Sequence, residues 1–277
     1  MPGGEHGKKS AGGTFLFWRH LSHKEGKITL AGLNQETSAV GESGAAMFQK
    51  SWSIYDALSE KNYMHHREIY ARVEEWLGQR GGEAYSILDL GCGNARFLAP
   101  CLKKHPPAMY VGVDLSAAAL EEAKEHLGSL LHVALRQEEM VEALKKSKSR
   151  FEVIFSGYAL HHLDAAKKVK FLTLCLERLA PGAALLLVDV VREEGESREA
   201  YIERYLEFMR RDWAEVPGHE LAEACAHVQA HDFPETESAL RGMGEKAGFA
   251  RMNRLARFGP HQLWELQTEE KSRMGKG

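Results

Sequence analysis

The chain has 277 residues, of which 44% are hydrophobic and 27% are charged, the balance of an ordinary globular protein. Lys and Arg total 36 and Asp and Glu total 39, so the formal net charge is −3 and the chain lacks the basic field expected of a nucleic-acid binder. No run approaches the roughly 18 apolar residues that span a bilayer, and the first residues lack the pattern of a signal peptide. The four cysteines form no Cys-x-x-Cys pair, which argues against a zinc cage or a disulfide framework. We therefore expect a reduced, cytoplasmic protein with no membrane partner, for which nucleic acid is not the expected partner either.

The N-terminal part of the chain has two sections of different composition. Residues 1–45 are rich in Gly, Ser and Lys, which bury little surface, and we interpret them as a flexible N-terminal extension. Over residues 46–82, apolar side chains recur at the spacing of one helix face, and Gly81-Gly82 ends the pattern. This second section predicts N-terminal cap helices.

Short apolar segments alternate with amphipathic segments over residues 83–192. Several of the apolar segments show no polar alternation, as in strands that are buried on both faces of a parallel sheet. The β-α-β alternation predicts an α/β fold with a doubly wound, mainly parallel sheet, and we assign it to cofactor binding. The expected strands are residues 86–90, 110–114, 131–135, 151–155 and 184–191, and the expected helices are residues 97–104, 117–127, 140–146 and 165–179.

A charged, helix-prone segment follows this alternation and is broken at Pro217-Gly218. We interpret residues 193–237 as a helical insertion that forms a cap. Residues 238–268 then predict one last helix, at 238–247, and two C-terminal strands, and residues 269–277 form a tail.

The most informative sequence is DLGCGN at residues 89–94, in which an apolar strand ends in a carboxylate and runs into a Gly-x-Gly turn. Glycines there permit a close approach of a ligand to the backbone. Asp114 ends the next apolar strand about 20 residues further on, where an acid can accept both hydroxyls of a ribose. Arg96 stands where a nicotinamide-dinucleotide fingerprint needs a small residue, and Asp89 would repel a pyrophosphate. The pattern therefore favours an uncharged or cationic adenosyl ligand over a dinucleotide.

This motif, followed by Asp114, resembles the class I S-adenosylmethionine-dependent methyltransferases. The resemblance covers roughly residues 50–267 and includes FEVIFS at 151–156, His161-His162-Leu163 and LAPGA at 179–183. It implies a seven-stranded Rossmann-like methyltransferase sheet with a helical cap, S-adenosylmethionine as cofactor and S-adenosylhomocysteine as product. The implied activity is SN2 transfer of a methyl group to an O, N, S or C nucleophile of a small molecule.

The resemblance also implies which residues meet the cofactor. Asp89 would organise the glycine loop, Asp114 would hold the ribose, and Glu139-Met140 would meet the adenine edge. Glu138 is an equally close candidate for the adenine, and either glutamate also fits a solvated helix start. The implied cofactor set is Asp89, Gly91, Cys92, Gly93, Asp114, Leu115, Glu139, Met140 and Ser156.

Candidate acceptor residues come from three segments, because ligands of such sheets bind outside the carboxyl ends of the strands. After the fourth strand, His161 or His162 is a candidate general base and Tyr158 a candidate wall, so we assign all three to catalysis; both histidines also fit a structural role. We expect no metal site from adjacent histidines alone, since neighbouring side chains on one element point in different directions; a site assembled across elements stays open. The N-terminal helices and the insertion supply the expected acceptor pocket, namely Tyr55, Tyr63, His65, Tyr201, Trp213 and His231.

Other functions stay open from the sequence alone, since a fold does not fix the acceptor. They are RNA or protein methylation, a non-catalytic S-adenosylmethionine-binding partner subunit and, more remotely, an NAD(P)-dependent oxidoreductase. The segment after the fourth strand lacks the Asn/Asp-Pro-Pro-aromatic motif of amino-group DNA methylases. The expected partner is a small-molecule acceptor, and a homodimer stays open.

Overall fold

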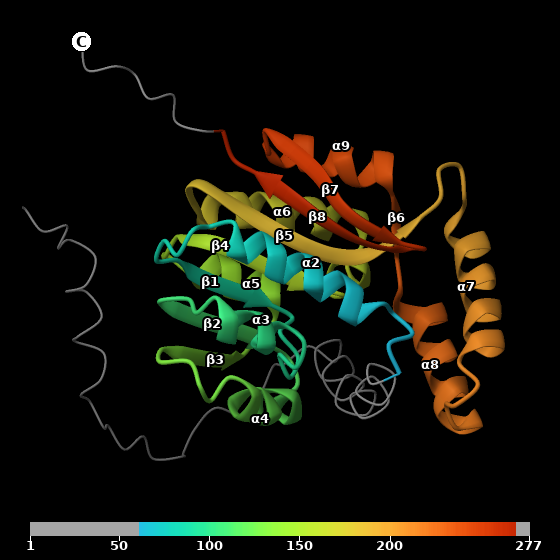
Figure 1. Ribbon diagram of the computed structural model, residues 1–277. Helices are drawn as coiled ribbons and strands as arrows, with labels where there is room; N and C mark the ends of the chain where they lie inside the picture. Colours follow the sequence, from blue (N-terminus) through green and yellow to red (C-terminus); the bar gives the residue numbers. More distant parts are fainter. Residues whose placement is uncertain (1–60, 270–277) are drawn as a thin grey trace, which may run out of the picture. The chain divides into compact units, whose positions relative to one another are not determined.

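The structure is a computed structural model that describes residues 61–269 (Figure 1). The expected N-terminal extension lies outside the described residues. So do residues 46–60 of the expected cap helices, with Tyr55, and residues 270–277 of the tail. Of the helices in the described range, none combines the length and the apolarity needed to cross a bilayer.

Seven of the described strands form one continuous sheet in the order β3-β2-β1-β4-β5-β8-β7 (Figure 1). The first five strands of this order run parallel, and β8 runs antiparallel to both of its neighbours. A short strand, β6, pairs with the end of β5. The doubly wound, mainly parallel sheet predicted from the sequence is confirmed. The bounds are β1 Ser86–Leu90, β2 Met109–Asp114, β3 Val133–Gln137, β4 Phe151–Gly157, β5 Leu179–Arg192, β6 Glu235–Thr236, β7 Arg251–Phe258 and β8 His261–Gln267.

Helices cover both faces of the sheet, as the alternation of strand side chains requires. In β1, Ile87 belongs to one buried cluster and Leu88 to the other. In β5, Leu186 and Leu187 are divided in the same way. The first cluster contains side chains of α2 (His66–Gly78), α3 (Leu98–Lys104) and α4 (Ala117–His126), and the second contains side chains of α5 (Met140–Lys146), α6 (Ala165–Arg178) and α9 (Glu237–Ala247).

Side-chain caps fix where several of these helices begin. Ser116 Oγ accepts a hydrogen bond from the Ala119 N–H at 3.2 Å, and Asp164 accepts one from the Lys167 N–H at 2.8 Å. Such a cap is worth roughly 1 kcal/mol. Because each cap lies just after a strand end, it also fixes the edge of the sheet at which α4 and α6 start.

Two predicted elements were wrong in detail. The third strand was expected at 131–135, but β3 is shifted two residues along and is mostly exposed, because it is the edge strand and pairs with no strand beyond it among residues 61–269. The helix at 165–179 was expected to end at Leu179. Instead, β5 begins there, because Leu179 pairs with Phe151 of β4 before a register shift.

The segment after β5 forms two helices, α7 (Arg198–Asp212) and α8 (Gly218–His231), which lie side by side and are drawn in orange in Figure 1. Pro217 precedes α8, where its fixed backbone angle suits a helix start. A single 3-10 turn, η1 (Leu160–His162), follows β4. These elements stand at the carboxyl ends of the strands, where β1 lies between β2 and β4 and the strand order reverses.

Candidate active site

A cavity of about 550 Å³ opens at the carboxyl ends of the parallel strands. Gly91 and Asp114 line one end of it, and Trp213 and Asp232 line the other. Between these ends the wall is mainly apolar, with Met64, Leu163, Val190 and Met209 among its side chains. The cavity thus joins the glycine loop to the helical insertion.

The glycine loop has a backbone geometry that favours glycine. Gly91 has a φ of 74° and Gly93 a φ of 52°, in the left-handed region. A Cβ on Gly91 would lie 2.7 Å from the Cβ of Ala159, which closes that side of the loop. The Gly91 and Cys92 N–H groups donate to the Val113 carbonyl at 2.9 and 3.0 Å. These bonds tie the loop to the end of β2.

Asp114 is fixed at the end of β2 by the same loop. Its two carboxylate oxygens accept hydrogen bonds from the Gly93 N–H and the Ser116 N–H, both at 2.8 Å. Burial raises the pKa of Asp114, and the backbone donors oppose that rise. The carboxylate lines the cavity and is oriented before any ligand arrives.

Asp89 lies behind the loop. It is 2% exposed and accepts a hydrogen bond from the Tyr110 hydroxyl at 2.7 Å. Burial raises its pKa to about 7, the bond from Tyr110 opposes the rise, and the nearby Asp114 carboxylate adds to it. Asp89 therefore supports the loop from the core.

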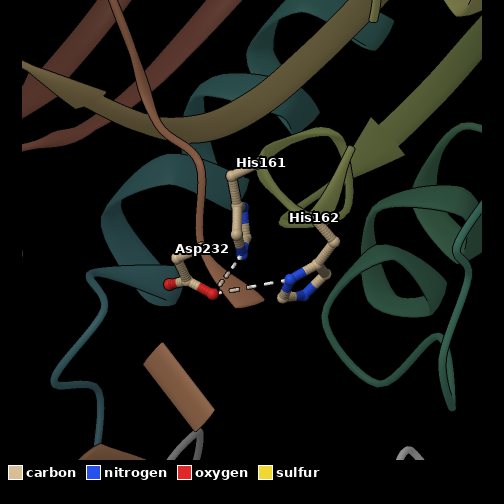
Figure 2. A group of neighbouring side chains, drawn as sticks. All are labelled: His161, His162 and Asp232. Atoms are coloured by element: carbon tan, nitrogen blue, oxygen red, sulfur yellow. Dashed lines mark ion pairs between the residues drawn. The ribbon is translucent and has the colours of Figure 1, made fainter. Parts of the chain in front are cut away.

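Four polar side chains cluster at the other end of the cavity. His161 and His162 lie on η1 with ring centroids 4.0 Å apart, and both face the Asp232 carboxylate (Figure 2). The Nε2 atom of His161 lies 3.8 Å from Asp232 Oδ1, and the Nδ1 atom of His162 lies 3.5 Å from the same oxygen. On its far side, His161 Nδ1 is hydrogen-bonded to the buried Asp189 of β5. We call His161, His162, Asp189 and Asp232 the polar cluster.

Electrostatics within the polar cluster are dominated by burial and by the two carboxylates. Burial opposes the charged form of His161, but Asp189 and Asp232 outweigh it, so the pKa of His161 is raised. Burial and the neighbouring His161 lower the pKa of His162. Burial opposes ionisation of Asp232, yet the two histidines hold its pKa below the ordinary value. The cluster therefore holds negative charge in a dry site.

Comparison with known proteins fits this geometry. Residues 87–182 match the sequence model of a family described as a methyltransferase domain. A carboxy-S-adenosyl-L-methionine synthase of Trichodesmium erythraeum is 25% identical over 212 residues, 74% of this chain and 81% of that protein. A malonyl-[acyl-carrier protein] O-methyltransferase of Halalkalibacterium halodurans is 33% identical over 121 residues, 42% of this chain and 44% of that protein. Magnesium protoporphyrin IX methyltransferase of Synechocystis, solved with bound S-adenosylhomocysteine, shares the fold, with a TM-score of 0.57 at 16% identity over 83% of this chain and 99% of that one.

Residues 87–182 are thus a methyltransferase domain, and the findings together support a class I S-adenosylmethionine-dependent methyltransferase. It is an enzyme of the small-molecule methyltransferase type, and its cofactor is S-adenosylmethionine. The cavity of this methyltransferase suits that cofactor on two grounds. The loop leaves no room for a Cβ at Gly91, and Asp114 already presents a fixed acceptor beside it.

The methyltransferase brings most of the expected cofactor residues to the cavity wall. Glu139 lines the wall and also caps α5, accepting from the Glu142 N–H at 2.9 Å. Ser156 lies behind the wall and donates to the Leu90 carbonyl at 3.0 Å. The wall contains Gly91, Gly93, Asp114, Leu115, Glu138, Glu139 and Met140, whereas Asp89, Cys92 and Ser156 are not part of it.

Some of the expected acceptor residues also line the cavity wall, and others lie outside it. Trp213 lines the wall, and Tyr63 stacks behind it with ring centroids 5.3 Å apart. Tyr158 also lines the wall, has a φ of 55° and donates from its hydroxyl to the Met64 carbonyl at 2.5 Å. Outside the wall, His65 stacks on Phe258, Tyr201 is fully buried on α7, and His231 lies against His227.

Sequence reasoning missed both carboxylates of the polar cluster. Asp189 could have been singled out from the sequence, because it is an acid inside the otherwise apolar run 184–191. Asp232 had no such signal, since it follows α8 and meets η1 only through the fold. The expectation that the adjacent side chains of His161 and His162 point in different directions was also wrong, because a 3-10 turn places their rings together.

Proposed function

We propose that this methyltransferase methylates a hydroxyl oxygen of a small, largely apolar molecule, whose proton is released at the polar cluster. The observation that carries the proposal is a buried group of two carboxylates and two imidazoles at the end of an otherwise apolar cavity wall. An apolar pocket with a few convergent polar groups is the usual form of a small-molecule site.

The cofactor would occupy the end of the cavity formed by the glycine loop. Asp114 would accept the ribose hydroxyls, the backbone of Gly91 and Gly93 would lie alongside the ligand, and Glu139-Met140 would meet the adenine. When bound, S-adenosylmethionine supplies a methyl carbon on a sulfonium, open to in-line displacement by a nucleophile. Asp114 is suited to its role because two backbone N–H groups already hold its carboxylate in place.

The acceptor would occupy the end formed by the insertion. Val190, Met209 and Trp213 offer apolar surface there, and His161 also lines the cavity. Within the polar cluster, His161 and Asp232 are each 5% exposed, Asp189 is buried, and His162 is partly exposed. A small molecule enters such a site more readily than a folded macromolecule does, which favours a small acceptor.

Oxygen is favoured as the nucleophile because the polar cluster can help a hydroxyl to lose its proton. A neutral hydroxyl must lose its proton to attack well, whereas a thiolate or a neutral amine needs no such help. His161 is oriented by Asp189 so that Nε2 points toward the cavity side of the cluster, where a hydroxyl could be held. The names of the Halalkalibacterium relative and of ubiquinone biosynthesis O-methyltransferases of Coxiella burnetii also specify oxygen.

The test uses S-adenosylmethionine with an isotopically labelled methyl group and a panel of phenols and hydroxy acids, each with its amine and thiol analogue. We expect labelled methyl ethers or esters together with S-adenosylhomocysteine. In His161→Asn, kcat should fall by about 10²–10⁴-fold while the cofactor Kd stays within twofold. His219→Asn, which changes an exposed histidine on α8, is the control.

Three results would contradict the proposal. The first is label on nitrogen or sulfur with normal kcat in His161→Asn. The second is methylation of protein or RNA but of no small molecule. The third is recovery of a carboxylated S-adenosylmethionine, the product named for the Trichodesmium relative, in place of a methylated acceptor.

A further inference from the structure

We propose that His161, His162 and Asp232 bind one divalent transition-metal ion of the Zn²⁺ type, which would hold and ionise the acceptor hydroxyl. This inference rests on the proposed O-methylation and adds to it the group that removes the proton. Two imidazoles and one carboxylate form a ligand set that suits Zn²⁺ and its first-row neighbours rather than Mg²⁺ or Ca²⁺.

The ligand atoms are close to the spacing that such an ion needs. Bonds of about 2.0–2.2 Å in a tetrahedral site place neighbouring ligand atoms roughly 3.4 Å apart. Here the separations from Asp232 Oδ1 are 3.5 Å to His162 Nδ1 and 3.8 Å to His161 Nε2. All three atoms lie within 4.8 Å of one another. Figure 2 shows both rings directed at the same carboxylate oxygen, so a side-chain adjustment that brings the two ring nitrogens closer together would complete the site.

Asp232 supplies the second, independent observation. Its Oδ1 atom is buried and accepts no hydrogen bond from the described residues. Both facing ring nitrogens stand beyond the ordinary N–H···O distance of about 3.2 Å. A buried carboxylate oxygen without a donor is costly, and a cation between it and the two rings would remove that cost.

Asp189 completes the arrangement as a positioning residue. It holds Nδ1 of His161, and its Oδ1 also accepts from the Val190 N–H at 2.9 Å. With the proton on Nδ1, the lone pair of Nε2 is directed toward Asp232, as it must be in a metal ligand. A carboxylate behind a ligating histidine is the usual supporting partner at such sites.

Charge and access support the same inference. Asp189 and Asp232 bring two carboxylates to the polar cluster, and a divalent cation would balance their charge when both imidazoles are neutral ligands. All three ligand residues line the cavity, so the remaining coordination positions face the space for the acceptor. Coordination would lower the pKa of the hydroxyl, as Zn²⁺ lowers that of water to about 7, and the proton would pass to solvent. The oxygen lone pair would then form the bond to the methyl carbon as the carbon–sulfur bond breaks and its electron pair returns to sulfur, which leaves S-adenosylhomocysteine.

The test measures Zn²⁺ and Co²⁺ binding to the tag-free full chain after chelator treatment and dialysis. We expect one ion per chain and visible Co²⁺ absorption bands typical of tetrahedral nitrogen and oxygen ligation. Asp232→Asn and His162→Gln should each weaken Zn²⁺ binding by about tenfold or more. His219→Gln and Glu220→Gln, a neighbouring His–Glu pair on α8 outside the cavity, are the matched controls. Melting temperature and cofactor Kd show whether each variant is folded.

The outcomes separate this inference from the proposed function. No Zn²⁺ binding by the folded wild-type protein, or equal binding by wild type and Asp232→Asn, overturns the metal site. Full O-methylation by metal-free protein also overturns it and leaves the proposed function standing. Zn²⁺ binding that is lost in both ligand variants, in a protein that transfers no methyl group to oxygen, supports the metal site and overturns the proposed function.

Discussion

The two ends of the cavity are built in different ways. At the glycine loop, the segment 89–94 and Asp114 are joined by backbone hydrogen bonds, and the chain between them is one β-α-β unit. At the polar cluster, η1 meets Asp189 across 28 residues and the end of α8 across 69 residues. One end is therefore determined by local backbone geometry, and the other by side chains that only the complete fold brings together.

This difference predicts that the two ends respond separately to substitution. The first end presents a fixed carboxylate and backbone atoms to its ligand, and the second presents apolar walls around one polar cluster. Variants of the wall near α8 should impair turnover without changing cofactor affinity. Variants of Asp114 should weaken cofactor binding without impairing turnover, measured at saturating acceptor.

The largest effect is expected from filling the acceptor end. Ala224 lies on α8, is 9% exposed and lines the cavity. In Ala224→Phe the added ring would occupy acceptor space, so turnover should fall by more than 10²-fold while the cofactor Kd stays within twofold. Overpacking of this kind typically costs about 1–3 kcal/mol, so melting temperature is measured alongside. Ala226→Phe, exposed on the same helix, is the control. Loss of cofactor binding in folded Ala224→Phe would show that the two ends overlap.

The next effect concerns the cofactor end. Asp114→Asn removes the charge of the expected ribose acceptor, and hydrogen bonds to charged groups are worth about 1.5–3 kcal/mol each. Cofactor affinity measured by calorimetry should fall by about 10–100-fold. Glu121→Gln, an exposed carboxylate on the following helix, should bind normally. Unchanged affinity in Asp114→Asn would remove Asp114 from the cofactor site.

The same contrast explains how much could be predicted from the sequence. The sheet, its helices and the glycine loop follow from hydrophobic periodicity and from glycine positions, because each depends on residues close together in the chain. Even there, β3 was predicted two residues too early, since an edge strand carries little hydrophobic signal. Leu179 was predicted to end a helix, but it belongs to β5 because it pairs with Phe151. Within the site, His161 could be singled out by its place after β4. Its partners Asp189 and Asp232 could not be paired with it, because their contacts arise from tertiary packing.

His66 is buried at the start of α2 beside Tyr158, a residue of the cavity wall, and it gives a smaller, pH-dependent effect. Its ring stacks on Phe97 with centroids 4.4 Å apart and lies 4.9 Å from the Tyr158 ring. Burial lowers its pKa to about 3, so its contribution to stability is present above pH 6.5 and is lost progressively as the pH falls from 6.5 toward 3. In His66→Phe, which keeps a ring but cannot ionise, the difference in unfolding free energy from wild type should shift in favour of the variant by about 2 kcal/mol between pH 7 and pH 5.

Denaturant unfolding of both proteins across this pH range measures that shift, and using the difference removes the other titrating groups. His219→Phe, on an exposed surface, should give a difference independent of pH. A pH-independent difference for His66→Phe as well would mean that the buried ring is not a titrating contributor to stability.

The smallest effect is expected from Tyr158→Phe. The Tyr158 hydroxyl donates to the Met64 carbonyl and so ties the loop after β4 to the segment before α2, both of which line the cavity. Loss of one such bond typically costs about 0.5–1.5 kcal/mol, so unfolding free energy should fall by about 1 kcal/mol. Because the ring itself remains in the wall, acceptor KM should rise only a few-fold, and cofactor Kd should not change. Tyr63→Phe, which keeps the ring that stacks on Trp213, is the matched control. A change in cofactor Kd of the same size as the change in acceptor KM would show that the Tyr158–Met64 hydrogen bond couples the two ends of the cavity. It would then not act on the acceptor end alone.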